Sequence, residues 1–384
     1  MFLLRDARPA DLADLQAVAA HLDSVNLPDD RDRLQALIVT SQASFAAQSD
    51  VADRRFLFVL TDTDSGRVVG SSMIFAQHGS RRAPHVYFDV LEEERYSQTL
   101  DRHFIHRILR IGYNYKGLTE IGGLALLPSL RGHPERLGGL LFAVRFVYLA
   151  LHRSLFRDEV LSELMPPLEP DGTSLLWEAL GRRFTGLSYQ EADRLSHENK
   201  EFIRTLFPEE PIYATLFPQG VQDVIGQVGP GTKGVEMMLR RIGFDYANRI
   251  DPFDGGPHFQ ARIDDVALVR ETRRVQIADE IPSEVPDNAP ISRVASRFLV
   301  AAESAPRSLA TVAPGDSLFR AAAITAVLDG DFIHVSPRDR LLLAVTSGDE
   351  VACLPLEAHR QHGSVDRQTG SQTGSQTVKS VGIA

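Results

Sequence analysis

The sequence predicts an α/β fold, or a related α+β fold, followed by a smaller β-rich region. Two observations support this class. Strand-like apolar runs and amphipathic helical stretches alternate through the first two thirds of the 384-residue chain. From about residue 263 the pattern changes to short strand-like runs separated by turn residues. We therefore expect one α/β domain over residues 1–262 and a β-rich region over residues 263–357.

The α/β domain is expected to begin with a strand and a helix. Pro9 and Asp11, which are favoured in the first turn of a helix, follow the strand-like run FLLRDA. A hairpin is predicted for residues 55–75, because the turn-rich DTDSG separates two apolar runs. The other elements expected in this half are a helix over 101–115, a strand over 119–127, a helix over 139–156 and a strand over 157–165.

Further helices are predicted for GTSLLWEALGRRF, with Thr173 or Ser174 as its N-cap, and for the segment after Gly231. The strand-like runs of the β-rich region should pack together or close on themselves, since open sheet edges promote aggregation. These runs are VALVRETRRVQIADEIP, RFLVAAE, LATVAPG, FIHVS and RLLLAVTSGDEVACLPLE. The repeat QTGSQTGSQT has too little apolar surface to fold, so residues 358–384 are expected to form a disordered tail.

Composition and charge argue against several functions. The net charge of −10 provides no overall positive field, which disfavours binding to nucleic acids or to anionic membranes. No apolar run is long enough for a transmembrane helix, and the N-terminus lacks the pattern of a signal peptide. The single cysteine, Cys353, is expected to be a core residue, and a chain without disulfides fits a reducing compartment. We therefore expect a cytoplasmic protein.

The segment 119–141 carries the clearest functional signal. A strand-like run ends near Pro128, and a basic loop containing Arg131, Gly138 and Gly139 leads directly into an amphipathic helix. A helix N-terminus with free backbone N–H groups binds anionic phosphates, and glycines allow the backbone to approach the ligand closely. The loop matches neither the P-loop nor the Rossmann glycine pattern, which weakens nucleotide hydrolysis and dinucleotide binding as functions.

This loop resembles the pyrophosphate-binding loop of GNAT-type acyl-CoA N-acyltransferases, although it is longer than the family spacing by about two residues. The wider chain resembles the arginine N-succinyltransferase family, which has a GNAT-like fold. The resemblance covers about residues 1–270. It rests on blocks in the family's order, namely RDARPADLADL, FLFVLTDTDSGRVVGSSMI, FAVRFVYLA, GTSLLWEALGRRF, NKEFIRTLFPEEPIY, QDVIGQVGPGTKGVEMMLRRIGFDY and IDPFDGGPHFQARIDDVALVR.

The resemblance implies that an acyl-CoA, either succinyl-CoA or a related thioester, donates its acyl group to the amine of arginine or a similar small molecule. It also implies a homo- or hetero-oligomer built with a related chain. The acyl-CoA would lie along the strand GGLALL, with Leu124 at the family position assigned to succinyl-CoA contact. The residues expected to bind it are Leu124, Leu126, Arg131, Gly138 and Gly139. No metal site is expected, because the histidines are scattered and lack zinc-site spacing.

The chain departs from the family pattern at its presumed proton donor. The family's histidine after IGQV is replaced by Gly229, and the loss of a general acid typically costs about 10²–10⁴-fold in rate. If only this acid is missing, Gly229→His should raise succinylation of arginine. Other polar family positions also differ, and they are occupied here by Asp89, Arg95, Gly122, Gly123 and Met165. The loss of two family arginines, at positions 89 and 165, indicates altered ligand electrostatics.

Three residues remain as candidates for the proton chemistry: Glu163 as a base, and Tyr213 or His133 as an acid. Each also has a structural interpretation, as a strand-end carboxylate, a core tyrosine and a solvated loop histidine. Asp251 and Asp254 are expected to cap a turn or to contact the amine. A second hypothesis is that the chain is a non-catalytic paralogue, a subunit or regulatory protein that keeps the fold but lacks the histidine.

Overall fold

The computed structural model describes residues 1–21, 27–81, 83–196, 199–279, 295–304 and 317–356. The expected tail over 358–384 and the run LATVAPG lie outside the described residues. The strands are β1 Phe2–Asp6, β2 Arg55–Asp62, β3 Val68–Phe75, β4 His85–Ser97, β5 Arg102–Asn114, β6 Thr119–Leu126, β7 Glu159–Glu163, β8 Ile212–Tyr213, β9 Asp245–Ile250, β10 Pro257–Arg262, β11 Arg273–Ile277, β12 Ser296–Glu303, β13 Phe319–Asp329, β14 Phe332–His334 and β15 Glu350–Pro355.

The helices pack against the sheet. They are α1 Leu12–Ala19, α2 Arg31–Phe45, α3 Leu137–Leu151, α4 Arg182–Thr185, α5 Tyr189–Ser196, α6 Glu201–Leu206, α7 Gln219–Val224, α8 Lys233–Arg241, α9 Ala267–Glu271 and α10 Pro337–Leu343. A π-helical turn, Trp177–Gly181, precedes α4, and Ser174 caps this segment by accepting a hydrogen bond from the Trp177 N–H. One of the two N-caps predicted for it, Ser174, is therefore confirmed.

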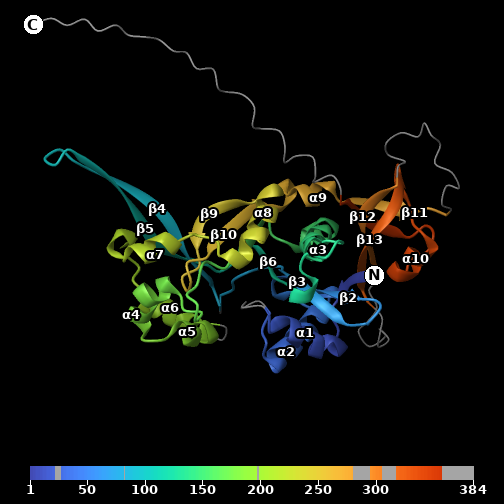
Figure 1. Ribbon diagram of the computed structural model, residues 1–384, viewed down its shortest axis with the longest axis horizontal. Coiled ribbons are helices and arrows are strands. Elements are labelled where there is room, and N and C mark those ends of the chain that lie inside the picture. The colour runs from blue at the N-terminus through green and yellow to red at the C-terminus, as the bar shows by residue number, and fades with distance from the viewer. Residues whose placement is uncertain (22–26, 82, 197–198, 280–294, 305–316, 357–384) are drawn as a thin grey trace, which may run out of the picture.

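The central sheet has helices on both faces. Its strands follow the order β1-β2-β3-β6-β7-β10-β9-β4-β5-β8. Side chains alternate along β2, because successive residues of a strand point to opposite faces. Phe56 and Phe58 pack in the core that contains α3, whereas Leu57 and Val59 pack with α1 and α2. Figure 1 shows α1 and α2 on one side of these strands and α3 on the other. The predicted hairpin over 55–75 is confirmed as β2 and β3.

The sheet splits beside α3, between two parallel strands. The strands β6 and β7 pair only at Thr119↔Val160 and Glu120↔Leu161, although β6 continues to Leu126. On its other side β6 pairs with β3, and the register shifts between Ser71 and Met73. The bulge on β6 and the short pairing with β7 expose the C-terminal half of β6 to the space beneath α8.

Residues 101–115 form a strand, so the prediction of a helix there was wrong. They make up β5, which pairs with β4 from His85↔Asn114 to Ser97↔Arg102. The long cross-strand pairing decides this segment, and helical spacing of apolar residues gave a misleading signal. The hairpin β4–β5 extends from the molecule as an arm (Figure 1). Its base is covered by α4 to α7, which pack in a core with Trp177, Phe88 and Leu109.

The β-rich region closes into a small barrel, as the expectation of protected edges required. The strands run in the order β12-β15-β11-β14-β13, and β13 also pairs with β12 to complete the circuit. The strand β13 pairs with β1 as well, and this joins the barrel to the central sheet. Two runs expected to be strands begin as helices: α9 occupies 267–271 and α10 occupies 337–343. Each helix packs an apolar face on its neighbours. A short apolar run in the sequence fits such a helix and a strand equally well, so the sequence could not distinguish them.

Helices long and apolar enough to cross a membrane are absent from the described part of the chain.

Candidate active site

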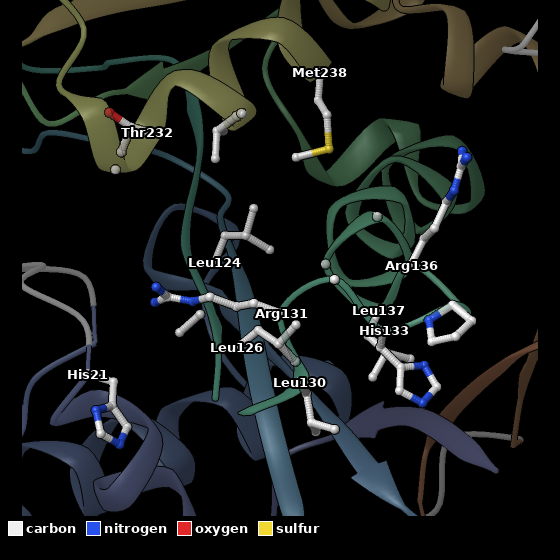
Figure 2. Close-up of a pocket in the computed structure, with 18 residues that line it drawn as sticks. His21, Leu124, Leu126, Leu130, Arg131, His133, Arg136, Leu137, Thr232 and Met238 are labelled. Carbon is white, nitrogen blue, oxygen red and sulfur yellow. The ribbon is translucent and has the colours of Figure 1, made fainter. Parts of the chain in front are cut away.

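A pocket of about 680 Å³ lies between β6, the N-terminus of α3 and the segment leading into α8. All five residues that the sequence predicted to bind acyl-CoA line it, namely Leu124, Leu126, Arg131, Gly138 and Gly139. The opposite wall comes from residues 231–238, and Figure 2 shows Thr232 and Met238 facing Leu124 across the pocket. We call this cavity the acyl-CoA pocket, after the ligand that the sequence predicts for it.

The bulge on β6 lies in the wall of this pocket. Gly123 and Leu124 stand together opposite Ser72, because Ser71 pairs with Ala125 and Met73 pairs with Gly122. Gly123 has a φ of +55°, a left-handed conformation that glycine adopts without strain. A bulge leaves its extra residue outside the regular hydrogen-bond ladder. Leu124 can therefore present its backbone N–H toward the pocket.

The loop between β6 and α3 closes by successive tight turns. The N–H groups of Leu130, Arg131, His133 and Arg136 each donate to the carbonyl three residues earlier. These turns take up the extra length that distinguishes the loop from the GNAT spacing. A Cβ added to Gly138 would meet nothing within 4 Å, so a ligand can approach the first turn of α3. The positive end of the α3 dipole and its unpaired amides favour an anion there.

The basic side chains of the loop lie on different sides of the pocket. In Figure 2 Arg131 extends toward the side of His21, whereas Arg136 and His133 lie on the α3 side. The His133 ring packs edge-on against Phe2 at 5.2 Å, and its Nδ1 accepts a hydrogen bond from the Glu135 N–H. Arg131 is therefore the better placed charge for a pyrophosphate, and His133 is held by structural contacts.

Gly229 lies two residues before Gly231, which lines the acyl-CoA pocket. Its N–H donates to the Met165 carbonyl at 2.8 Å, and Thr232 Oγ1 donates to the same carbonyl at 2.9 Å. A Cβ at Gly229 would lie 2.5 Å from the Pro166 carbonyl oxygen. Real Cβ atoms do not approach backbone so closely, so a side chain at position 229 requires the backbone of 165–166 to move.

A second cavity, of about 500 Å³, lies on the far side of this contact. Met165 and Glu163 line it, and Glu120 reaches it from β6, four residues before Leu124. We call it the acidic cavity, because eight carboxylates line it against one arginine and one lysine. The carboxylates are those of Asp29, Asp30, Glu120, Glu163, Asp171, Asp193, Asp251 and Asp254, and the cations are Arg33 and Lys200.

Asp251 and Asp254 cap a turn, as expected, and they also line the acidic cavity, whereas their contact with an amine stays a prediction. Asp251 Oδ1 accepts from the Phe253 N–H at 2.7 Å, and Asp254 Oδ1 accepts from the Gly256 N–H at 2.7 Å. Burial, together with the charge of Glu163, raises the pKa of Asp251 to about 7. Burial and the neighbouring Asp251 raise the pKa of Asp254 well above its ordinary value. These carboxylates therefore favour a positively charged ligand.

Glu163 lies among three histidines at the end of this cavity. Its Oε1 is 3.0 Å from His85 Nε2, 3.4 Å from His258 Nε2 and 4.0 Å from His78 Nε2. Burial alone would raise the pKa of Glu163, but the surrounding histidines lower it well below its ordinary range. Burial, together with His78, lowers the pKa of His85 to about 3, and burial also lowers the pKa of His258. Burial opposes the charged form of His78 as well, but Glu120 raises its pKa.

Tyr213 is not brought together with the other candidates. It lies on β8, six strands from β6 in the sheet order, and its hydroxyl donates to Glu93 on the β4–β5 arm. Arg95 pairs with the same Glu93. Asp89, which the sequence assigned to the ligand cleft, lines neither cavity and is bound by Arg249 Nε at 2.9 Å. The family arginine is missing at positions 89 and 165. Of these two, only Met165 lines one of the two cavities.

The sequence analysis missed His78, His85, His258 and Glu120. They lie far apart in the chain, and no spacing motif connects them. His258 on β10 is the register partner of Glu163 on β7, a relationship that only the folded sheet reveals. The absence of a metal site was expected from the spacing of the histidines in the sequence, and it stays a prediction.

The bulged strand β6, its splayed parallel neighbour β7 and the helix α3 that follows β6 define the fold of the GNAT-type acyl-CoA N-acyltransferases. The sequence profile described as "Arginine N-succinyltransferase beta subunit" matches residues 2–268. The chain belongs to the arginine N-succinyltransferase family.

Named relatives and a solved structure agree with this assignment. The arginine N-succinyltransferase of Yersinia enterocolitica is 30% identical over 361 residues, which span 93% of this chain and 99% of the relative. Subunit beta of the Pseudomonas aeruginosa enzyme is 31% identical over 361 residues, with coverage of 92% and 99%. The structure of arginine/ornithine succinyltransferase subunit AI from Pseudomonas aeruginosa superposes with a TM-score of 0.73 at 28% identity, covering 92% of this chain and 98% of that one.

Proposed function

We propose that the protein is an acyl-CoA-dependent N-acyltransferase whose acceptor is a small cationic amine such as arginine. One observation supports this most directly: the acyl-CoA pocket and the acidic cavity adjoin. They share β6, which places Glu120 in the acidic cavity and Leu124 in the acyl-CoA pocket, and they are separated by the contact between Met165 and the Gly229–Thr232 turn. Two substrates bound in these cavities would meet along one strand, which supplies the proximity that amide formation needs.

In the proposed binding mode the CoA pyrophosphate lies at the start of α3 and pairs with Arg131. The thioester lies beside the β6 bulge. The amine nitrogen attacks the carbonyl carbon, the C–S bond breaks, and the CoA thiolate leaves. The backbone N–H of Leu124 would stabilise the oxyanion, since preorganised amides are most effective where negative charge develops. Succinyl-CoA is the donor implied by the names of the relatives.

The acidic cavity supports a cationic acceptor. Arginine carries an ammonium and a guanidinium group, and both are attracted by buried carboxylates. Its carboxylate would need a basic partner, and Arg33 and Lys200 line the same cavity. Glu163 is the proposed base for the ammonium proton, because it is the candidate from the sequence that lies in this cavity.

Gly229 favours a second candidate function, that of a non-catalytic subunit. Position 229 carries no imidazole, and the surrounding backbone leaves no room for one. A chain with this feature could bind acyl-CoA and still transfer nothing.

A binding and turnover assay distinguishes these functions. The purified chain is titrated with CoA, acetyl-CoA and succinyl-CoA by calorimetry, and CoA thiol release is then followed with arginine, ornithine, lysine and a neutral amine as acceptors. Catalysis predicts saturable acyl-CoA binding and thiol release that requires a cationic amine. Binding without thiol release would favour the subunit function. No CoA binding at millimolar ligand would overturn both.

We also propose that the β4–β5 arm contacts a second chain of this fold. Beyond its pairing with β9 and β8, the arm is a two-stranded hairpin, which is only marginally stable alone in water. Large apolar side chains are exposed along it: Leu91, Tyr96, Leu100, Phe104 and Ile105. Light scattering tests the assembly. Phe104→Asp should dissociate it, whereas Leu341→Asp should not, since Leu341 is 81% exposed on α10. A wild-type monomer would overturn the proposal.

A further inference from the structure

Four imidazole and carboxylate groups converge at the end of the acidic cavity from separate strands. His258 on β10 and Glu163 on β7 are register partners, so their side chains lie on the same face of the sheet. His85 is the first residue of β4, and its ring stacks on that of His258 with centroids 5.3 Å apart. His78 follows β3, and its ring contacts His85 edge-on at 4.4 Å.

From this geometry we infer that His78, His85, His258 and Glu163 form a binding site for one divalent transition-metal ion of the zinc type. Ligand atoms of His78, His85 and Glu163 lie within 4.8 Å of one another, and so do those of Glu163, Asp251 and His258. The two groups share Glu163, so binding of one ion by all three histidines requires small side-chain movements. A tetrahedral zinc ion with bonds of about 2.0–2.2 Å places its ligand atoms about 3.3–3.5 Å apart. The distances from Glu163 Oε1 to the three Nε2 atoms are 3.0, 3.4 and 4.0 Å, which bracket that separation.

His258 supplies an independent observation. Its side chain is 1% exposed, and neither ring nitrogen has a hydrogen-bond partner. Burying a polar group without a partner costs free energy, so such groups are rare unless something binds them. His85 Nε2 also lacks a hydrogen bond, in a side chain that is 5% exposed. A metal ion at Glu163 would satisfy both imidazoles at once.

The orientation of His78 fits the same ion. Its Nδ1 lies 2.5 Å from Glu120 Oε2, which leaves Nε2 directed at the cluster. A metal-binding histidine usually donates its other ring N–H to a carboxylate in this way, and that partner fixes the ring and tunes the affinity. Glu120 would therefore be a positioning residue rather than a ligand.

The ligand set selects the class of ion. Three imidazoles and one carboxylate suit Zn²⁺ and the neighbouring first-row divalent ions, whereas Ca²⁺ and Mg²⁺ require mainly oxygen ligands. The double positive charge would also offset the carboxylates of Asp251 and Asp254 nearby. An ion bound here makes Glu163 a ligand, so the role of base proposed for Glu163 applies only to the metal-free protein. The metal site does not depend on acyl transfer, because metal binding is measured without acyl-CoA.

Metal analysis of the full chain tests the inference. The protein is analysed as isolated by mass spectrometry of its metals, stripped with a chelator, and titrated with Co²⁺. We expect one equivalent of Co²⁺, visible d–d bands of a four-coordinate ion, and displacement by Zn²⁺. Zn²⁺ should also raise the melting temperature of the stripped protein, because a ligand that binds only the folded state stabilises it. No stoichiometric Co²⁺ binding would overturn the inference.

Variants separate this site from adventitious binding by surface histidines. Glu163→Gln keeps the shape of the side chain and should abolish the d–d bands and the Zn²⁺ stabilisation, and His258→Ala should do the same. Glu120→Gln keeps all four ligands and should weaken affinity by about 10–100-fold. His106→Ala, on the exposed arm, should bind as wild type does. Unchanged Co²⁺ binding by folded Glu163→Gln and His258→Ala would show that the ion binds elsewhere.

Discussion

The N–H of Gly229 donates to the carbonyl of Met165 at 2.8 Å, and this contact joins the walls of the two cavities. Met165 faces the acidic cavity, while Thr232, three residues after Gly229, faces the acyl-CoA pocket. Position 229 is therefore not a vacancy left by a missing histidine. It is a close backbone approach that glycine permits.

Gly229→Ala should destabilise the protein, because its Cβ would lie 2.5 Å from the Pro166 carbonyl oxygen. Overpacking of this kind typically costs about 1–3 kcal/mol. Gly231→Ala is the matched control, since a Cβ there meets nothing within 4 Å, and it should change the free energy of unfolding by no more than about 0.5 kcal/mol. Urea denaturation measures both. Equal stabilities would contradict the close packing at Gly229.

Gly229→His should not raise acyl transfer, for the same steric reason. The expectation from the sequence alone was a gain if only the acid was missing. The structure requires the 165–166 backbone to move before an imidazole fits, and that movement disturbs both cavities. Turnover with succinyl-CoA and arginine measures the result. A clear increase in kcat would show that the segment adapts and that the acid is the missing group.

Arg131→Glu should weaken CoA binding by at least about tenfold, because a charge-assisted hydrogen bond to phosphate is replaced by repulsion. Arg241→Glu is the control. It changes the net charge equally, lies on the exposed side of α8 and does not line the pocket. Calorimetric titration with CoA at two salt concentrations measures both variants. If Arg131→Glu binds CoA as tightly as Arg241→Glu does, the proposed pyrophosphate site is wrong.

Tyr213→Phe should leave kcat within about twofold of wild type. Six strand spacings of about 4.8 Å place Tyr213 roughly 29 Å from β6, too far for proton transfer within one chain. Loss of a general acid would instead lower kcat by about 10²–10⁴-fold. The pH profile of kcat distinguishes these outcomes, and a large loss with a changed alkaline limb would place Tyr213 at the reaction.

Cys353 should react slowly with thiol reagents while the protein is folded. It lies in the barrel core with no exposed surface, and burial raises the pKa of its thiol to about 11. The reactive thiolate is therefore scarce at pH 8 and increases as the pH rises toward 11. We expect labelling more than about 100-fold slower than that of free cysteine at pH 8. Stoichiometric labelling of the folded protein at the rate of free cysteine would contradict the buried position.

Local sequence patterns predicted the elements whose signals lie within a few residues. The hairpin β2–β3, the N-cap at Ser174 and the loop before α3 follow from turn residues, capping residues and glycines. The error at β5 has a different origin. Its apolar residues fit a helical spacing, but pairing with β4 over the whole strand decided its conformation. The closure of the barrel through β12 and β13 likewise depends on contacts distant in sequence.

The acyl-CoA pocket and the acidic cavity also differ in how far local sequence patterns could predict them. The acyl-CoA pocket was predictable because Leu124, Arg131 and Gly138 belong to one strand–loop–helix unit, whose geometry is local. The histidines around Glu163 come from β4, β10 and the end of β3. No spacing along the chain reports their convergence, so the sequence indicated no metal site there.

The sequence by itself determined the family, the α/β character of the first region and the strand–loop–helix unit around Arg131, since these depend on motifs and on residues close in the chain. Only the tertiary structure decided the rest. Sheet order brought Glu163 into contact with His85 and His258, and it separated Tyr213 from the pocket. The close approach of the Pro166 backbone requires glycine at position 229. Strand pairing and close packing join residues that are about 60 to 95 positions apart in these contacts, and that information is not carried by any local pattern.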